Sequence, residues 1–121
     1  MQFARESLQR HTIRRYAHTT VWIADDAYEG SLAVSSDEIV TDWTCNTVES
    51  LDEELVAAIA DLKPEVVVIA TGTSVVFPAA PVLHTLMRAG IGVEVMNDGA
   101  AIRTFNVLLS EERRAALALI R

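Results

Sequence analysis

Polar residues able to do chemistry follow an apolar run in the second half of the chain. Directly after Glu65–Ala70 come four of them, Thr71, Gly72, Thr73 and Ser74. A loop of this type between a strand and a helix can present backbone N–H groups to an anion. It matches neither G-x-G-x-x-G nor G-x-x-x-x-G-K-[ST], so the sequence carries no nucleotide signature. The alternative interpretation is a tight turn that closes the strand.

Glu94 is the most reactive side chain of the next apolar run, Ile91–Met96. If helices cover both faces of the sheet, this carboxylate needs a partner, because an unpaired buried charge is very costly. Arg103 follows on the next helix and is the candidate partner, so we expect Glu94 to be ionised and near the Thr71–Ser74 loop. A structural ion pair, or a Glu94 that points out at a sheet edge, is favoured over a general base.

Two more polar residues, Thr104 and Asn106, interrupt the same apolar helix. Both are mediocre helix formers, and they either line a cleft beside the loop or face solvent. The sequence therefore predicts a non-catalytic pocket, for which the candidate residues are Thr71, Gly72, Thr73, Ser74, Glu94, Arg103, Thr104 and Asn106.

The elements that must position these residues alternate between strands and helices. Strands are expected at Glu65–Ala70 and Ile91–Met96, joined as a parallel βαβ unit by a helix that begins after Pro78 or Pro81 and ends at Gly90. The carboxyl ends of parallel strands meet at one edge of a sheet, which is where ligands usually bind, and here these ends are Thr71–Ser74 and Asn97–Ala100.

Two further helices and an ambiguous segment complete this half. Ser50 and Glu53 fit a capping box, so a helix should begin at Ser50 and end before Pro64. Another helix should start near Asp98. Helix formers at the end of the chain favour a helix, but the apolar run Ala115–Ile120 also fits a buried strand, and periodicity cannot decide between them.

The first half is rich in β-branched and aromatic residues, which predicts an antiparallel meander. The expected strands are Thr20–Ala24, Gly30–Ser35 and Glu38–Trp43. The chain of 121 residues suits a single domain, with a β-rich meander over 1–47 and an αβαβαβ half over 48–121. The fold class is α/β, with three layers and a mixed, largely parallel central sheet preceded by the meander.

Charge and composition exclude several classes of function. The net charge is −7, with 10 Lys+Arg against 17 Asp+Glu, which disfavours a nucleic-acid partner. No apolar run approaches the ~18 residues of a membrane span, and the first residues do not form a signal peptide. With Cys45 as the lone cysteine, the sequence predicts a cytoplasmic protein, either a monomer or a homodimer.

No metal site or cofactor is expected. The three histidines, His11, His18 and His84, lie far apart without ligand companions, and Cys45 lacks the base that a nucleophile needs. The large aromatic residues Trp22, Trp43 and Phe77 are expected to pack in the core rather than form an exposed apolar patch.

Several segments together resemble a known family. They are Pro64–Thr73, Gly90–Met96, Ala101–Glu111 and, more weakly, Tyr28–Leu32 and Val40–Trp43. The family is the one of small uncharacterised domains that includes the third assembly factor of mitochondrial respiratory complex I and the adipogenesis-associated protein of vertebrates. It commonly shows Gly-Thr-Gly after the central strand, where this chain has Thr71-Gly72-Thr73.

The resemblance implies a fold more than a function. It implies a three-layer α/β domain whose last segment is a strand, so we expect Arg114–Ile120 to be a strand and to form three consecutive inner strands with Glu65–Ala70 and Ile91–Met96. The family as a whole has no established catalytic activity, and its mitochondrial branch acts through protein partners.

Two hypotheses follow for function. The first is a non-enzymatic protein-interaction or assembly module with a protein partner and no membrane insertion. The second is a small-ligand-binding protein or modest enzyme that uses the Thr71–Ser74 loop. A closed polar pocket at that loop would favour the second, and a flat apolar surface would favour the first.

Overall fold

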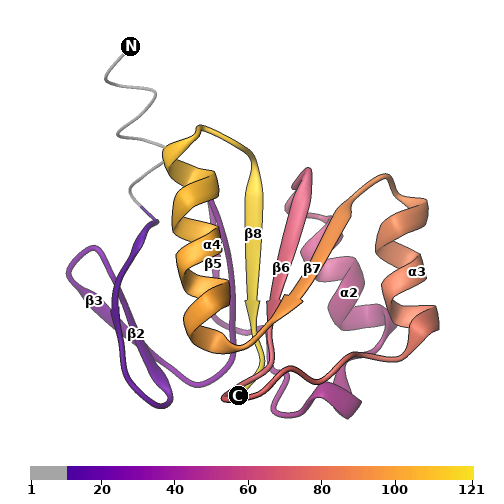
Figure 1. Ribbon diagram of the computed structural model, residues 1–121, viewed down its shortest axis with the longest axis horizontal. Helices are drawn as coiled ribbons and strands as arrows, with labels where there is room; N and C mark the ends of the chain where they lie inside the picture. The colour runs from indigo at the N-terminus through magenta and orange to yellow at the C-terminus, as the bar shows by residue number, and fades with distance from the viewer. Residues whose placement is uncertain (1–10) are drawn as a thin grey trace.

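The computed structural model describes residues 11–121, and its centre is a mixed five-stranded sheet (Figure 1). The strand order is β5-β4-β8-β6-β7, and a separate antiparallel sheet has the order β1-β2-β3. The strands are β1 Ile13–Tyr16, β2 Thr20–Ile23, β3 Asp26–Glu29, β4 Leu32–Ser35, β5 Ile39–Val40, β6 Val66–Ala70, β7 Gly92–Met96 and β8 Ala115–Leu119. The helices are the 3-10 turn η1 Val48–Ser50, α2 Glu53–Ala60, α3 Ala80–Arg88 and α4 Asp98–Ser110.

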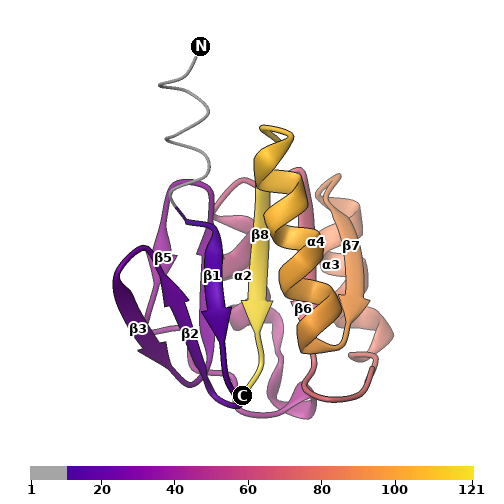
Figure 2. The same ribbon diagram turned by 60° about the vertical axis from the view of Figure 1, so that its left-hand side comes forward.

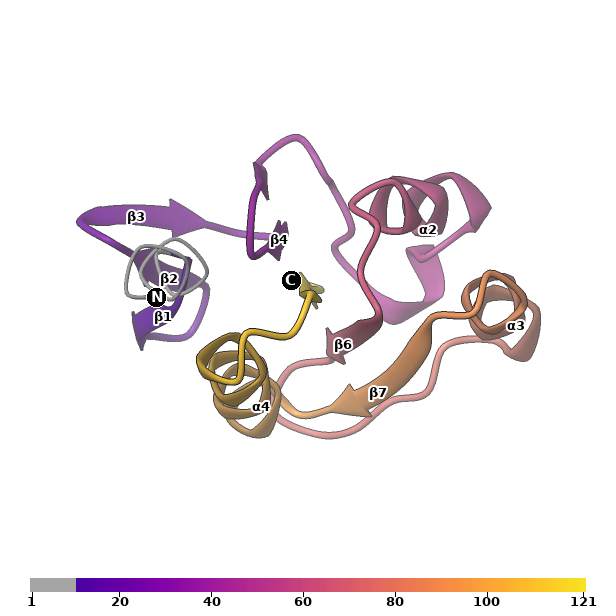
Figure 3. The same cartoon turned by 90° about the horizontal axis from the view of Figure 1, so that it is seen from above.

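Three layers enclose two apolar cores, one on each face of the central sheet. Figures 1 and 3 show α2 and α3 together on one side of the sheet and α4 on the other. Figure 2 shows the strands of the small sheet β1–β3 side by side, and Figures 1 and 3 show this sheet next to α4. One core joins Val56, Ile59 and Leu86 to the central sheet, and the other joins Phe105, Leu109 and Val21 to it. This confirms the predicted α/β class.

The last segment is a strand, as the resemblance implied, although local propensity favours a helix. All five residues of β8 are buried, and the strand lies between β4, to which it is antiparallel, and β6, to which it is parallel. A central strand pairs along both edges and buries both faces, which outweighs the helix preference of Ala and Leu.

The βαβ unit is also confirmed, with one difference. β6 and β7 are parallel and pair from Val66↔Gly92 to Ala70↔Met96. β7 is the edge of the sheet rather than an inner strand, because β6 is followed in the order only by β7. Because an edge strand is open to solvent along one side, the Glu94 carboxylate can stay hydrated. The reason to expect a buried Glu94 therefore no longer holds.

The predicted meander is divided between the two sheets. Leu32–Ser35 and Ile39–Val40 pair antiparallel with each other and join the central sheet through β8. The small sheet instead contains β2 together with β1 and β3, two strands that the apolar pattern did not indicate. Both are mostly exposed and polar, so they lack the apolar alternation by which strands are recognised.

The predicted capping box at Ser50 is wrong. Ser50 ends the 3-10 turn, and its hydroxyl lies 2.7 Å from that of Thr47. The cap of α2 is Asp52, whose carboxylate accepts a hydrogen bond from the Leu55 N–H at 2.9 Å. Leu51 is buried in extended backbone between the two, and this burial moves the start of the helix beyond Ser50.

The three aromatic residues predicted to be in the core differ in how far they are buried. Trp43 is buried and its indole N–H donates to the Leu55 carbonyl at 2.9 Å, while Trp22 is partly exposed beneath the guanidinium of Arg15. The prediction for Phe77 is wrong, because 70% of this residue is exposed. Among residues 11–121, no helix combines the length and apolar character needed to cross a bilayer.

Candidate functional site

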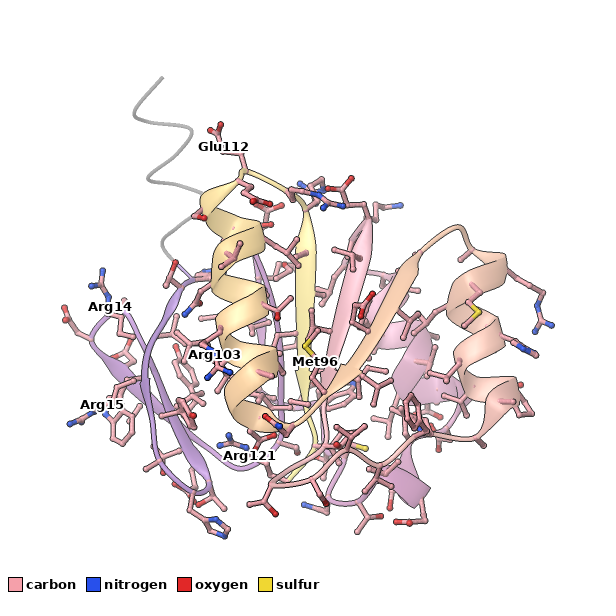
Figure 4. All side chains as sticks on the ribbon, viewed as in Figure 1. Arg14, Arg15, Met96, Arg103, Glu112 and Arg121 are labelled. Carbon is pink, nitrogen blue, oxygen red and sulfur yellow. The ribbon has the colours of Figure 1, made fainter. Side chains whose placement is uncertain are left out.

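A cavity of about 770 Å³ opens where β6, β7 and β8 end. Its walls come from four places: the loop after β6, the first turn of α4, the hairpin between β1 and β2, and the two residues after β8. Figure 4 shows Arg121 on this edge of the sheet, below the first turn of α4. The lining residues are Tyr16, Ala17, His18, Thr19, Thr71, Gly72, Thr73, Ser74, Asn97, Asp98, Gly99, Ile120 and Arg121.

The loop after β6 is held in shape by its own polar groups. The Thr71 hydroxyl lies 2.7 Å from the Ser74 carbonyl, to which it donates, and it accepts from the Val76 N–H at 3.1 Å. Gly72 has a φ of +99°, a conformation that side chains rarely adopt, so the turn requires glycine here. Thr71 is therefore a positioning group, and the Thr73 and Ser74 side chains remain exposed at the cavity mouth.

Asp98 joins the loop to the first turn of α4. Its backbone N–H donates to the Gly72 carbonyl at 2.8 Å, and the Gly72 N–H donates back to the Asp98 carboxylate at 2.9 Å. The Asn97 side chain caps the helix by accepting from the Ala100 N–H at 2.9 Å. The cavity thus meets the positive end of a helix of thirteen residues.

Arg121 forms the floor of the site and is only partly paired. Its Nη2 atom lies 3.3 Å from the second carboxylate oxygen of Asp98, and the exposed fractions of the two side chains are 4% and 16%. The Arg121 Nε and Nη1 atoms are buried and have no hydrogen-bond partner among the described residues. The guanidinium is thus only partly satisfied by the described residues, and the Asp98 carboxylate beside it already accepts a hydrogen bond on each oxygen.

Four of the eight predicted residues line this cavity, and the other four do not. Thr71, Gly72, Thr73 and Ser74 belong to it. Glu94 is exposed on the edge strand β7, and within the described chain it forms no ion pair with Arg103. Arg103 is exposed on α4, where Figure 4 shows it beside the helix above Arg121.

The other two predicted residues hold elements together. The Asn106 side chain accepts from the Ile13 N–H and donates to the Ile13 carbonyl, both at 2.9 Å, so it takes the place of a neighbouring strand for β1. The Thr104 hydroxyl lies 3.3 Å from the Met96 sulfur. Thr104 and Asn106 thus make contacts between elements rather than lining a cleft or simply facing solvent.

Arg121 was not among the predicted site residues, and Asp98 was covered only by the strand-end range Asn97–Ala100. A usable signal for Arg121 was present, because it follows the end of a strand of the same sheet, as Thr71 and Asp98 do. Applying the strand-end rule to β8 as well would have found it.

Cys45 lies behind Arg121 and is inert. Its carbonyl accepts from the Arg121 N–H at 3.1 Å, and its side chain is fully buried. Burial, reinforced by the negative charge of Asp52, raises the pKa of the thiol to about 11, so the nucleophilic thiolate is scarce at neutral pH. Across residues 11–121, no three His, Cys, Asp or Glu side chains gather as metal ligands.

A second feature lies farther along the same loop. Val75, Val76 and Phe77 form an exposed apolar segment, with exposed fractions of 46%, 39% and 70%. Its backbone is anchored at its middle, because the Val76 N–H donates to the Thr71 hydroxyl, and just after its last residue, because Pro78 is buried. We call Val75–Phe77 the apolar segment.

Comparison with known proteins places these features in a family. A sequence profile described as "Protein of unknown function (DUF498/DUF598)" matches residues 13–120. A protein of Xanthomonas campestris solved by NMR has a TM-score of 0.80 and 34% identity, with 89% of this chain and 82% of that chain covered.

Two curated relatives carry the name NADH dehydrogenase (ubiquinone) 1 alpha subcomplex assembly factor 3. The one from Danio rerio is 37% identical over 83 residues, which cover 67% of this chain and 48% of the relative. The one from Xenopus tropicalis is 30% identical over 118 residues, which cover 96% of this chain and 64% of the relative. The chain thus spans about half to two thirds of the length of these relatives.

Proposed function

Since the chain belongs to the family of proteins of unknown function DUF498/DUF598, we propose that it is a non-enzymatic protein-interaction module that helps to assemble a larger protein complex. The single observation that carries this proposal is the apolar segment. The names of the two assembly-factor relatives support it.

The apolar segment has the chemistry of a docking site. A phenylalanine that is 70% exposed leaves most of its apolar surface in water, and burying such a side chain against a partner is favourable by about 1.5–3 kcal/mol. Aromatic side chains are also the residues that dominate many protein interfaces. Three consecutive exposed apolar residues are therefore best explained by a partner that covers them.

The backbone of the segment is ordered before any partner arrives. The Thr71 hydroxyl holds Val76 at its middle, and the buried Pro78 follows its last residue. Binding then costs little loop entropy, which favours a specific contact. Figure 1 shows the loop passing from β6 to α3 on the side of the molecule where β7 is the last strand of the sheet. The proposed partner is a different protein that presents an apolar pocket to Phe77.

Site-specific photocrosslinking in cells that make the protein naturally tests this proposal. A photoreactive phenylalanine analogue is placed at Phe77 or, as the matched control, at Val107 on α4, which is apolar and 53% exposed. We expect a discrete covalent adduct with a different protein at position 77 and not at position 107. We also expect Phe77→Asp to reduce recovery of that protein at least tenfold while leaving the thermal midpoint unchanged.

Two results would overturn the proposal. One is an equal set of adducts at both positions, which would indicate collisions rather than docking. The other is adducts that contain only second copies of this chain.

A further inference from the structure

The polar cavity and its buried arginine call for an acceptor that residues 11–121 do not supply. We propose that the cavity binds a small organic anion, whose carboxylate or phosphate group accepts hydrogen bonds from the Arg121 guanidinium. This site is separate from the apolar segment and does not rest on the proposed interaction.

The burial of Arg121 is the first argument. Its side chain is 96% removed from solvent, as the exposed fraction of 4% shows. A guanidinium has five N–H donors, and the hydrogen bond to Asp98 uses Nη2 alone. The Nε and Nη1 atoms have no partner within residues 11–121, and they are themselves closed off from the cavity. A buried donor without an acceptor costs free energy, and more so when the donor is charged, so a turn of the guanidinium toward an acceptor in the cavity that Arg121 lines is favourable.

The surroundings favour an oxyanion as that acceptor. The first turn of α4 contributes the positive end of its dipole, and Asn97, Asp98 and Gly99 of this turn all line the cavity. Arginine pairs preferentially with planar carboxylates and with phosphates. The cavity therefore combines a cationic donor with a helix terminus.

The carboxylates of Asp98 and Glu29 influence which anion the cavity should prefer. Asp98 accepts from Gly72 and Arg121, one on each oxygen. Hydrogen bonds from Thr19 and Thr20 lower the pKa of Glu29, and attraction to Arg121 adds to this effect. Because the Asp98 carboxylate already offsets the charge of the arginine, the site disfavours a doubly charged group. We therefore expect a carboxylate to bind better than a phosphate.

The size of the cavity indicates an organic ligand rather than a bare ion. Its volume of about 770 Å³ lies in the range of roughly 300–1,000 Å³ that is typical of small-molecule sites. Its wall includes Tyr16 and Ile120, which can cover an apolar body, and Thr73 and Ser74 stand exposed at its mouth. A short-chain carboxylate matches this combination.

NMR titration of the full chain provides the test. Sodium butyrate, sodium acetate and sodium phosphate are added separately at constant ionic strength, with sodium chloride as the reference. We expect saturable shifts of the Gly72 and Gly99 amide signals and of the Arg121 Nε–H signal, strongest with butyrate. If phosphate binds more tightly than either carboxylate, the site stands and its ligand is of the phosphate type.

Two arginine variants with the same change in charge provide the comparison. Arg121→Met should weaken butyrate binding at least tenfold. Arg88→Met, which removes an exposed arginine on α3, a helix that contributes no residue to the cavity wall, should leave it unchanged. Should Arg121→Met fail to fold, the wild-type Nε–H signal alone decides, since it reports directly on the guanidinium.

The proposal is overturned if the wild-type signals respond to all four salts alike without saturation. It is equally overturned if a folded Arg121→Met variant binds butyrate as tightly as the wild type. Neither result affects the crosslinking at Phe77, so the two proposals fail independently.

Discussion

Two ion pairs at opposite ends of β8 have almost opposite properties. Arg113 lies two residues before the strand and Arg121 two residues after it. The Arg113–Glu65 pair has an N–O distance of 2.8 Å, and both side chains are about half exposed, at 47% and 52%. The Arg121–Asp98 pair has a longer distance of 3.3 Å, but its side chains are exposed by only 4% and 16%. Figure 4 shows the ends apart, with Glu112 at one and Arg121 at the other.

The distance between the charged atoms is a poor guide to how much an ion pair matters for stability. An exposed pair exchanges water for a partner and gains little, whatever its length. A buried pair cannot return to water, so losing one member leaves an uncompensated charge. The end of the sheet that holds Arg121 is therefore the sensitive one, and it is also the end that carries the cavity.

The largest expected effect is the loss of Asp98. Asp98→Ala removes the counter-charge of Arg121 and the acceptor of the Gly72 N–H, so we expect the free energy of unfolding to fall by about 3 kcal/mol. Urea denaturation followed by circular dichroism measures this loss. A change as small as that of Glu65→Gln would show that the two ends do not differ.

The reactivity of the Cys45 thiol measures how accessible the Arg121 end of the sheet is to reagents. A rise of its pKa from 9.0 to about 11 lowers the thiolate fraction at neutral pH by about a hundredfold, and burial adds a barrier to reagents. Alkylation by iodoacetamide should therefore be at least a hundredfold slower in the native protein than in 6 M urea. Equal rates would show that this end opens freely.

The same thiol makes stability depend on pH in the alkaline range. The folded-state pKa is the higher one, so the contribution of Cys45 is fully present below about pH 9 and is lost as the pH rises toward 11. The wild type should lose stability over this interval more steeply than Cys45→Ala, as measured by urea denaturation at each pH.

Loss of the Asp52 side chain, which lies near Cys45, should have a smaller effect on the free energy of unfolding. Asp52→Ala removes the cap of α2 and should cost about 1 kcal/mol, whereas Ser50→Ala should cost clearly less. The pair of variants, compared by urea denaturation, separates the cap in the structure from the one that the sequence suggested. A larger loss for Ser50→Ala would restore the capping box.

The smallest effect belongs to the exposed pair. The hydrogen bond from Arg113 lowers the pKa of Glu65, so any contribution is present at neutral pH and is lost as the pH falls below about 4.5. Because both side chains are half exposed, Glu65→Gln should leave the denaturation midpoint at pH 7 unchanged within error. A clear loss that high salt abolishes would contradict the contrast between the two ends.

Local pattern predicted the elements of the second half well. The apolar run through Val66–Ala70, the proline before α3 and the polar start of α4 each carry a short-range signal, and the strands and helices lie within a few residues of those signals. β8 is different, since Ala115–Leu119 fits a helix as well as a strand. The resemblance to a family, and not the pattern, resolved it.

The candidate site could be predicted only in part. The loop at Thr71–Ser74 was found because a strand-end rule needs nothing beyond the order of the elements. Of the two arrangements expected for Glu94, the exposed position at a sheet edge is the one found and the pair with Arg103 is not, because the burial of Glu94 depends on whether β7 is central or at the edge. Phe77 was assigned to the core for a similar reason, since its apolar character says nothing about which side of the loop faces the sheet.

The α/β class and the loop whose glycine and hydroxyl groups shape the cavity mouth could be predicted from the sequence alone. These depend on interactions between residues close along the chain. The burial of Arg121 against Asp98, with two of its nitrogens unpartnered among residues 11–121, and the hydrogen bonds from Asn106 to β1 are evident only in the folded structure. Such contacts join residues 23 and 93 positions apart, and their burial depends on strand order, which no local pattern encodes.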